Sequence, residues 1–228
     1  MISLITVNWH AYDFLEVLIE SLEIYTTKEV ELVVIDNSTS KREIPQKTYI
    51  RHIPMSRNIG HGEGLNLGSK LAKFEFVMFL DIDTHFLRHN WHDPLLEMMK
   101  TFDVVGGRGV PVKPIRPACM FMKKELACSY DWRPTEGYKG HRITPDGTDV
   151  AIKAYHQIKN NGLKIGFLET VPNRYGTKNG EEFTAFGESL VYHHWHGSHL
   201  VERQVDFPNF NLIEDKKVLF ESIPWRSI

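Results

Sequence analysis

The sequence predicts an α/β protein built on a mostly parallel sheet with helices on its faces. Strand and helix patterns alternate through the first hundred residues, an arrangement typical of parallel strands joined by helical crossovers. Polar residues follow three of the predicted strands, and ligands bind at the carboxyl ends of the strands in open parallel sheets. The length of 228 residues and the ordinary globular composition fit a single domain.

The first half contains the clearest elements. Apolar and β-branched residues predict strands at 2–8, 30–35, 48–53 and 75–80. Apolar residues recur at helical spacing over 11–25, and a second helix is predicted to end at Leu71.

The second half is less regular. Residues 106–117 are rich in Gly, Pro and Arg and predict a long connection, whereas 118–126 predict a strand that runs into a helix. A helix is predicted over 148–161, with Gly162 just beyond its end, and a strand at KIGFLE. Residues 172–188 predict a polar, mobile loop that closes over a ligand, with three flexible points at Gly176, Gly180 and Gly187.

Composition and charge argue against several classes of protein. The net charge of -2 provides no broad basic surface for nucleic acid or an acidic membrane. Two cysteines do not build a disulfide framework and favour a reducing compartment. The N-terminus lacks the features of a signal peptide, and no segment approaches the roughly 20 apolar residues of a membrane helix. We therefore expect a cytoplasmic protein with no transmembrane segment.

The segment FEFVMFLDID ends a predicted buried strand in two aspartates, Asp81 and Asp83. Their like charges repel unless a cation lies between them. Oxygen ligands suit Mg²⁺ or Mn²⁺, which keep coordination positions open for phosphate and water. The alternative is a corner with two exposed aspartates, but the buried strand before them favours the metal site.

Four histidines lie within the seven residues HHWHGSH, 193–199. An imidazole can complete a metal site that carboxylates begin. His194 and His196 share one face of an extended segment because Trp195 separates them. We expect one of the four histidines to be a ligand; the alternative is scattered surface histidines.

Other polar residues have a functional and a structural interpretation of similar weight. Asp36 and Asn8, each at the end of a strand, either contact a nucleotide or form turns. The segment SRNIGHGEGLNLG, with Arg57, either approaches a phosphate or needs positive φ angles. Of Asp146 and Asp149, one can cap the helix that follows and the other can act as a general base. Three aromatic residues either stack on a sugar ring or pack in the core: Trp132, Tyr138 and Trp195.

In their order and spacing, these motifs resemble those of the GT-A glycosyltransferases, and of family 2 in particular. The resemblance runs from residue 2 to about residue 203 and rests on ISLITVNWH, VVIDNSTS, RNIGHGEGLNLG, FLDID, TDVAIKAYHQIKNNG and HHWHGS. It implies one GT-A domain over 1–228. Residues 1–105 would bind the nucleotide sugar, and residues 106–228 would bind the acceptor and complete the metal site. One departure is the pair Thr148-Asp149, where the family usually has Glu-Asp.

The resemblance also implies an activity, which is inverting transfer of a sugar from a nucleotide diphosphate sugar, a UDP-sugar, to an acceptor hydroxyl. The cofactor would be Mn²⁺ or Mg²⁺. Asp83 would bind the metal, with His196 or else His194 as a further ligand, and Asp149 would be the base, with Asp146 as its rival. The implied nucleotide-binding positions are Val7, Asn8, Asp36, Arg57, Asn58, Asp81 and Ile82.

The sequence leaves other functions open. A nucleotidyltransferase would place a basic glycine-rich loop after the first strand, where NWHAYDF has no glycine. A metal-dependent hydrolase would need no nucleotide, and a binding module would turn nothing over. The sequence does not specify the sugar, the base of the donor or the oligomeric state. The acceptor is equally open among a glycan, a lipid-linked sugar, a protein and a modified nucleic acid.

Overall fold

The computed structural model describes residues 1–108, 115–134, 150–194 and 211–226. Its first half contains the four parallel strands that the sequence predicts, in the order β3-β2-β1-β4. Asn8 pairs with Asp36, so the carboxyl ends of β1 and β2 are level. The elements of this half are β1 (Ile2–Asn8), α1 (Tyr12–Tyr25), β2 (Val30–Asp36), β3 (Ile50–Pro54), α2 (His61–Leu71) and β4 (Phe76–Leu80).

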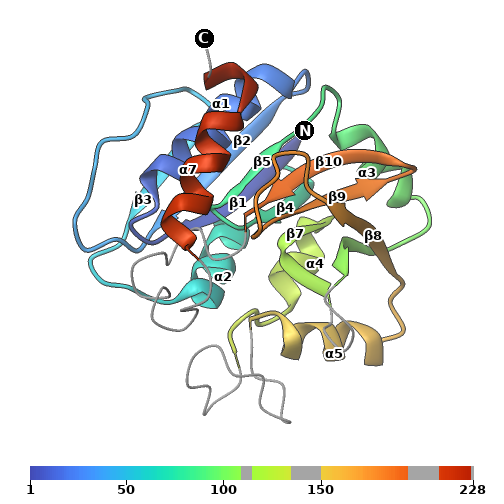
Figure 1. The fold of residues 1–228 in the computed structure, drawn as a ribbon. Coiled ribbons are helices and arrows are strands. Elements are labelled where there is room, and N and C mark those ends of the chain that lie inside the picture. Colours follow the sequence, from blue (N-terminus) through green and yellow to red (C-terminus); the bar gives the residue numbers. More distant parts are fainter. Residues whose placement is uncertain (109–114, 135–149, 195–210, 227–228) are drawn as a thin grey trace.

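The second half extends the same sheet beyond β4 (Figure 1). Within the described residues there is one ten-stranded sheet, in the order β3-β2-β1-β4-β7-β6-β8-β9-β10-β5. Strands β6 and β8 are parallel, and the other pairings that this half makes are antiparallel. The strands are β5 (Thr84–Phe86), β6 (Val104–Arg108), β7 (Ile115–Lys123), β8 (Ile165–Pro172), β9 (Glu181–Ala185) and β10 (Glu188–His193). The helices are α3 (His92–Met98), α4 (Lys124–Ser129), α5 (Ile152–Asn160), α7 (Leu212–Ser222) and the short 3-10 turn Pro224–Arg226.

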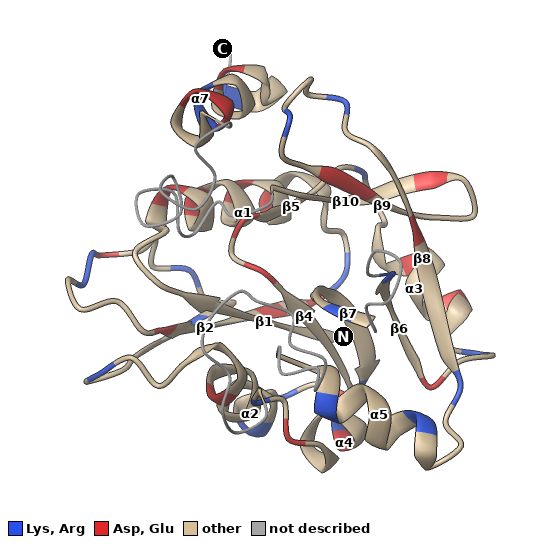
Figure 2. Cartoon of the chain, turned by 60° about the horizontal axis from the view of Figure 1, so that its bottom comes forward, with Lys and Arg blue, Asp and Glu red and all other residues tan. Residues whose placement is uncertain are grey.

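Helices cover both faces of the sheet. Figure 2 shows α1 and α7 on one side of the strands, with α2, α4 and α5 on the other. The apolar residues of β2 divide between these two cores in alternation: Leu32 and Val34 face the α1 side, and Val33 and Ile35 face the α2 side. Because both faces are buried, the strand is a continuous apolar run in the sequence.

Strands β4 and β5 are consecutive in the chain, yet they occupy the fourth and the last positions of the sheet order. Only residues 81–83 separate them, and we call this segment the DxD turn. The sheet therefore curls until β5, which pairs with β10, lies against α1, where the Phe86 N–H donates to Ser21 Oγ (3.1 Å). As a result, the DxD turn begins at the carboxyl edge of the parallel strands and ends beside His193, the last residue of β10, which pairs with Thr84 of β5.

Three sequence predictions are wrong in part. Residues 106–117 are not a single connection, because Gly106 to Arg108 belong to β6 and residues from Ile115 belong to β7. Residues 172–188 are not a continuous loop either, because residues 181–185 form β9, which makes a hairpin with β10. Within the described residues the helix predicted over 148–161 begins only at Ile152, although Gly162 follows its end with φ +74° as expected.

The glycines of α2 are required mainly by close packing. Gly60 precedes the helix with φ +85°, a conformation that favours glycine. Gly62, Gly64 and Gly68 lie inside the helix and are buried. A Cβ atom on Gly68 would lie 2.3 Å from Ile5 Cγ2. Gly64 and Gly68 therefore bring the helix close to Val7 and Ile5 of β1, whereas Gly62 lies against the backbone of Trp132 and Arg133.

We expect Gly68→Ala to lower the free energy of unfolding by about 1–3 kcal/mol, the usual cost of overpacking. This direction opposes helix propensity, which favours alanine over glycine by about 1 kcal/mol. Urea unfolding measures the change, with Lys70→Ala on the exposed side of the same helix as the control. A Gly68→Ala variant more stable than wild type would show that α2 does not need this close approach.

Among the described residues, no helix combines the length and apolar character needed to cross a membrane.

Candidate functional site

The DxD turn does not continue β4 as a strand. The chain turns after Asp81, whose carbonyl oxygen accepts hydrogen bonds from Thr84 N (3.2 Å) and Thr84 Oγ1 (2.7 Å). The Asp81 N–H donates to Ala118 O in β7 (3.3 Å), and His194 N donates to Asp83 O (2.9 Å). The backbone that carries the two aspartates is therefore held both by β7 and by the residue after β10.

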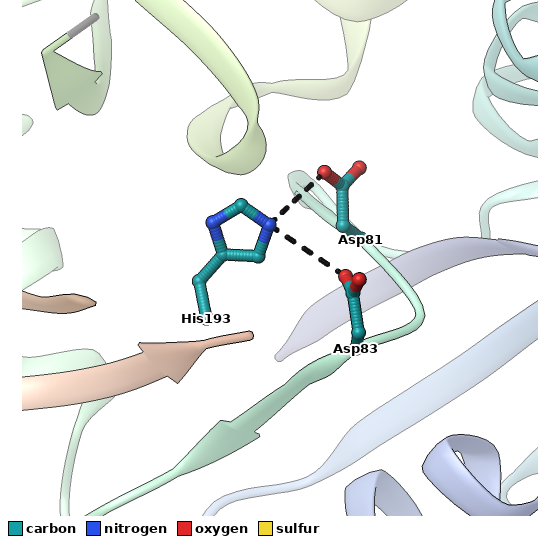
Figure 3. A group of neighbouring side chains, drawn as sticks. All are labelled: Asp81, Asp83 and His193. Carbon is teal, nitrogen blue, oxygen red and sulfur yellow. Dashed lines mark ion pairs between the residues drawn. The ribbon is translucent and has the colours of Figure 1, made fainter. Parts of the chain in front are cut away.

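Three side chains converge at this turn. Figure 3 shows the ring of His193, at the end of β10, pointing at the carboxylates of Asp81 and Asp83. His193 Nε2 lies 3.5 Å from Asp81 Oδ2 and 3.6 Å from Asp83 Oδ1. Asp83 is 4% exposed and His193 is 8% exposed, whereas the side chain of Asp81 is 26% exposed. Asp81 thus lies on the accessible side of a largely buried group.

The electrostatics of this group favour a positive charge. Burial lowers the pKa of His193, but the carboxylates of Glu181, Asp83 and Asp81 outweigh burial and raise the pKa above its usual value. The buried Asp81 Oδ1 has no hydrogen-bond partner, although His61 Nε2, on α2, lies 3.5 Å from it. Several acidic oxygens therefore face a small region that either an imidazolium or a metal ion would neutralise.

The three side chains fit a divalent cation. One donor atom from each of Asp81, Asp83 and His193 can be chosen so that all three lie within 4.8 Å of one another. Two carboxylates and one imidazole form a donor set that suits Mn²⁺ well and also accepts Mg²⁺.

Neither histidine predicted as a metal ligand, His194 or His196, is among the three convergent side chains of the described residues. His194, the residue after β10, is fully buried, with Nδ1 2.9 Å from the Tyr192 hydroxyl and its ring stacked on Phe14. It is not one of the three convergent side chains. His196 lies outside the described residues, as do both candidate bases, Asp149 and Asp146.

Asn8 and Asp36 meet at the carboxyl ends of β1 and β2. The Asp36 carboxylate is fully buried and accepts hydrogen bonds from Asn8 Nδ2 (3.1 Å), Ser38 N (3.0 Å) and the Tyr12 hydroxyl (2.8 Å). His52 Nε2 lies 2.9 Å from its second oxygen. Burial acts to raise the pKa of Asp36, but hydrogen bonds from Ser38, His52 and Tyr12 outweigh it and hold the pKa below its usual value. Asp36 therefore organises this edge of the sheet.

We expect Asp36→Asn to lower the free energy of unfolding at pH 7 by about 2–3 kcal/mol, as for a lost charged hydrogen bond. Because the folded pKa is depressed, the contribution is complete above the unfolded pKa of about 3.9 and is lost as pH falls through the folded pKa. The stability gap between wild type and variant should therefore narrow below about pH 4. Urea unfolding at several pH values tests this, with exposed Glu43→Gln as the control. A gap that does not change with pH would contradict the assignment.

The other predicted nucleotide positions surround the same edge. Val7 lies in β1 against α2, and Ile82, in the DxD turn, is 3% exposed. Arg57 and Asn58 are exposed in the segment before α2. Trp132, considered above for sugar stacking, is instead a core residue, fully buried against Phe79.

Four residues near the DxD turn received no specific role from the sequence: His61, Arg116, Glu181 and His193. His193 belongs to the histidine cluster, but both faces of β10 are buried, so alternation did not distinguish it from His194. Glu181 lies within residues 172–188, which the sequence predicts to be a loop. Two short β-prone runs around Phe186-Gly187 are a hairpin pattern that would have indicated a strand there.

Comparison with known families gives an independent result. Residues 3–150, more than half of the chain, match the family model described as glycosyl transferase family 2. A protein of Haemophilus influenzae described as an uncharacterized glycosyltransferase is 27% identical over 90 residues, which is 38% of this chain and 31% of that protein.

Solved structures share the fold. TarS of S. aureus aligns with a TM-score of 0.54 and 18% identity, over 97% of this chain and 42% of that chain. TarS 1-349 in complex with UDP-GlcNAc gives 0.53 and 16%, over 97% and 71% of the two chains. Mannosyltransferase PcManGT from Pyrobaculum calidifontis, in complex with GDP-Man and Mn²⁺, gives 0.50 and 15%, over 76% and 57%. At these identities the likeness is one of fold, and the chain spans less than half the length of the Haemophilus protein and of the longer TarS chain.

Proposed function

The chain belongs to glycosyl transferase family 2, and from this premise we propose that it transfers a sugar from a UDP-sugar to an acceptor hydroxyl, with inversion at the anomeric carbon. The observation that carries the proposal is the convergence of Asp81, Asp83 and His193 at the carboxyl edge of the parallel strands. This edge is where open α/β sheets bind their ligands.

For the donor, residues 1–105 supply the nucleotide side. The base and ribose would lie against the ends of β1 and β2, at Val7, Asn8 and the buried Asp36. The diphosphate would lie toward Arg57 and Asn58, where the start of α2 adds the positive end of a helix dipole. Proteins of this fold have been solved with UDP-GlcNAc and with GDP-Man, so the base is the first property to test.

For the metal, Asp81, Asp83 and His193 would hold Mn²⁺ or Mg²⁺. Ile82, which separates the two aspartates in the sequence, is a buried core residue. The bound ion would neutralise charge that develops on the leaving diphosphate. Asp83 and His193 are largely buried and would form the fixed side of the site, whereas the more exposed Asp81 would face the ribose and phosphate. Of the histidines predicted from the sequence, His196 stays a candidate further ligand, and His194 would act through its packing.

For the acceptor, residues 106–228 would supply the binding surface and the base. We propose Asp149 as the residue that takes the proton from the acceptor hydroxyl, with Asp146 as the rival. Ala151, two residues after Asp149, is buried with φ +69°, and its N–H donates to Trp132 O (3.2 Å). This conformation is costly for a residue other than glycine. The hydrogen bond to Trp132 helps to hold Ala151 in it, and so helps to fix the start of α5.

The products of donor turnover test this function. We expect slow release of UDP and free sugar from one UDP-sugar in the absence of acceptor, stimulated by MnCl₂ and abolished by EDTA. Chromatography of the products separates this outcome from its rivals. Release of UMP and sugar 1-phosphate would indicate a metal-dependent hydrolase, and formation of a nucleotide sugar from UTP and sugar 1-phosphate would indicate a nucleotidyltransferase.

A further inference from the structure

The ring of His193 has a second nitrogen, Nδ1, on the side away from the two aspartates. Glu181 is directly opposite His193 in the β9–β10 pairing, and its Oε1 lies 3.5 Å from Nδ1. Both residues are buried, at 7% and 8% exposure. Opposite residues in an antiparallel pair are close enough for their side chains to interact directly.

Arg116, on β7, holds Glu181 in place. Arg116 Nη1 lies 2.5 Å from the same oxygen, Glu181 Oε1. A guanidinium only donates hydrogen bonds, so this contact leaves the carboxylate an acceptor toward the imidazole. Three strands, β7, β9 and β10, thus contribute one residue each to a chain of contacts that runs from Arg116 through Glu181 to His193.

The flat face of the His193 ring is supported separately. Phe183 stacks on it, with ring centroids 6.0 Å apart and an interplanar angle of 15°. Phe183 in turn lies over Gly107, where a Cβ atom would be only 2.2 Å from Phe183 Cε1. Packing therefore limits the tilt of the imidazole, and the contact at Nδ1 distinguishes its two nitrogens.

We infer that Glu181, anchored by Arg116, is a positioning residue for His193. Its carboxylate selects the imidazole tautomer that is protonated on Nδ1, and this turns the Nε2 lone pair toward the two aspartates. Hydrogen bonds of this kind fix the orientation of metal-ligating histidines and raise their basicity. The inference rests on the proposed metal site, and Glu181 would act on it without being a ligand.

The decisive variant is Glu181→Gln, which keeps the shape of the side chain and removes its charge. We expect Mn²⁺ affinity to fall by about 10–100-fold, the usual effect of losing such a partner. The electron paramagnetic resonance signal of free Mn²⁺, titrated with MnCl₂ alone and again with UDP, measures this without catalysis. Because the lesion is in affinity, kcat at saturating Mn²⁺ should return toward the wild-type value.

Glu182→Gln is a matched control. Glu182 is the next residue, is 3% exposed, and forms an ion pair of its own with Arg174 at 2.9 and 3.0 Å. Its side chain lies on the other face of β9, because successive side chains alternate. Glu182→Gln therefore measures how the loss of a buried arginine–glutamate ion pair, away from His193, affects Mn²⁺ affinity. Arg116→Gln serves as a second variant if Glu181→Gln does not fold, and the same loss of affinity is expected.

The outcomes separate this inference from the proposed function. Weaker Mn²⁺ binding in Glu181→Gln, with wild-type binding in Glu182→Gln, supports it. Unchanged binding in Glu181→Gln, or an equal loss in both variants, overturns it while leaving the metal site intact. If the wild-type protein binds no Mn²⁺ with or without UDP, the proposed metal site fails, and this inference fails with it.

Discussion

Asp83→Ala is expected to lower metal-dependent sugar transfer by at least about 10³-fold. A metal ion on a leaving diphosphate supplies several kcal/mol of charge stabilisation, and each 1.36 kcal/mol is about tenfold in rate. Asp83 is the more buried of the two aspartates and lies 3.6 Å from His193 Nε2, so water does not easily replace its carboxylate. Initial rates with the preferred donor, at increasing MnCl₂, give the change.

Asp93→Ala is the control for this variant. Asp93 is an exposed residue of α3 that pairs with Lys28, and exposed ion pairs contribute little to stability. Its activity should match wild type. Melting curves without metal should show that Asp83→Ala still folds cooperatively. A folded Asp83→Ala variant with wild-type Mn²⁺-dependent rates would remove the metal assignment.

Asp149→Asn is expected to lower transfer by about 10²–10⁴-fold, the usual contribution of a general base. Donor binding should be unchanged, because the proposed nucleotide contacts lie on β1, on β2, in the segment before α2 and in the DxD turn. Single-turnover transfer measures the first quantity, and titration with UDP in the presence of Mn²⁺ measures the second.

Asp146→Asn is the paired variant. If it retains transfer while Asp149→Asn loses it, Asp149 is the base. The reverse result would assign the base to Asp146 and would leave Asp149 with a structural role. Loss of UDP binding in Asp149→Asn would mean that this carboxylate belongs to the donor site.

The first half of the fold was predictable because local patterns agree with tertiary structure there. Residues 2–8 and 30–35 are apolar runs that the sheet buries on both faces, and the helix pattern between them matches α1. The crossover rule then brings Asn8, Asp36 and the DxD turn to one edge. These inferences need no knowledge of distant contacts.

The second half was less predictable because its strands form through long-range antiparallel pairing. Arg108 and Arg116 lie in strands although Gly and Pro dominate the segment around them. Pairing between β6 and β7, and not local propensity, decides their conformation.

The candidate metal site was only half predictable, also because it depends on long-range strand pairing. The sequence indicates two carboxylates two residues apart and a nearby cluster of histidines. Whether His193 or His194 faces those carboxylates depends on the register of β10 with β5 and β9. A shift of the register by one residue turns every side chain of the strand to the opposite face. A strand that is buried on both faces has no alternation of polar and apolar residues that would indicate its register.

The melting temperature of the wild-type protein with UDP and GDP, each with and without MnCl₂, tests the central claim most directly. A ligand at 100 times its Kd stabilises the folded state by about 2.7 kcal/mol. For a chain of this size each kcal/mol shifts the melting temperature by about 2–4 °C. We predict a shift of several degrees with UDP that requires Mn²⁺ and is lost in Asp83→Ala. A shift with Mn²⁺ alone and none from either nucleotide would contradict the claim that this edge of the sheet binds a nucleotide sugar.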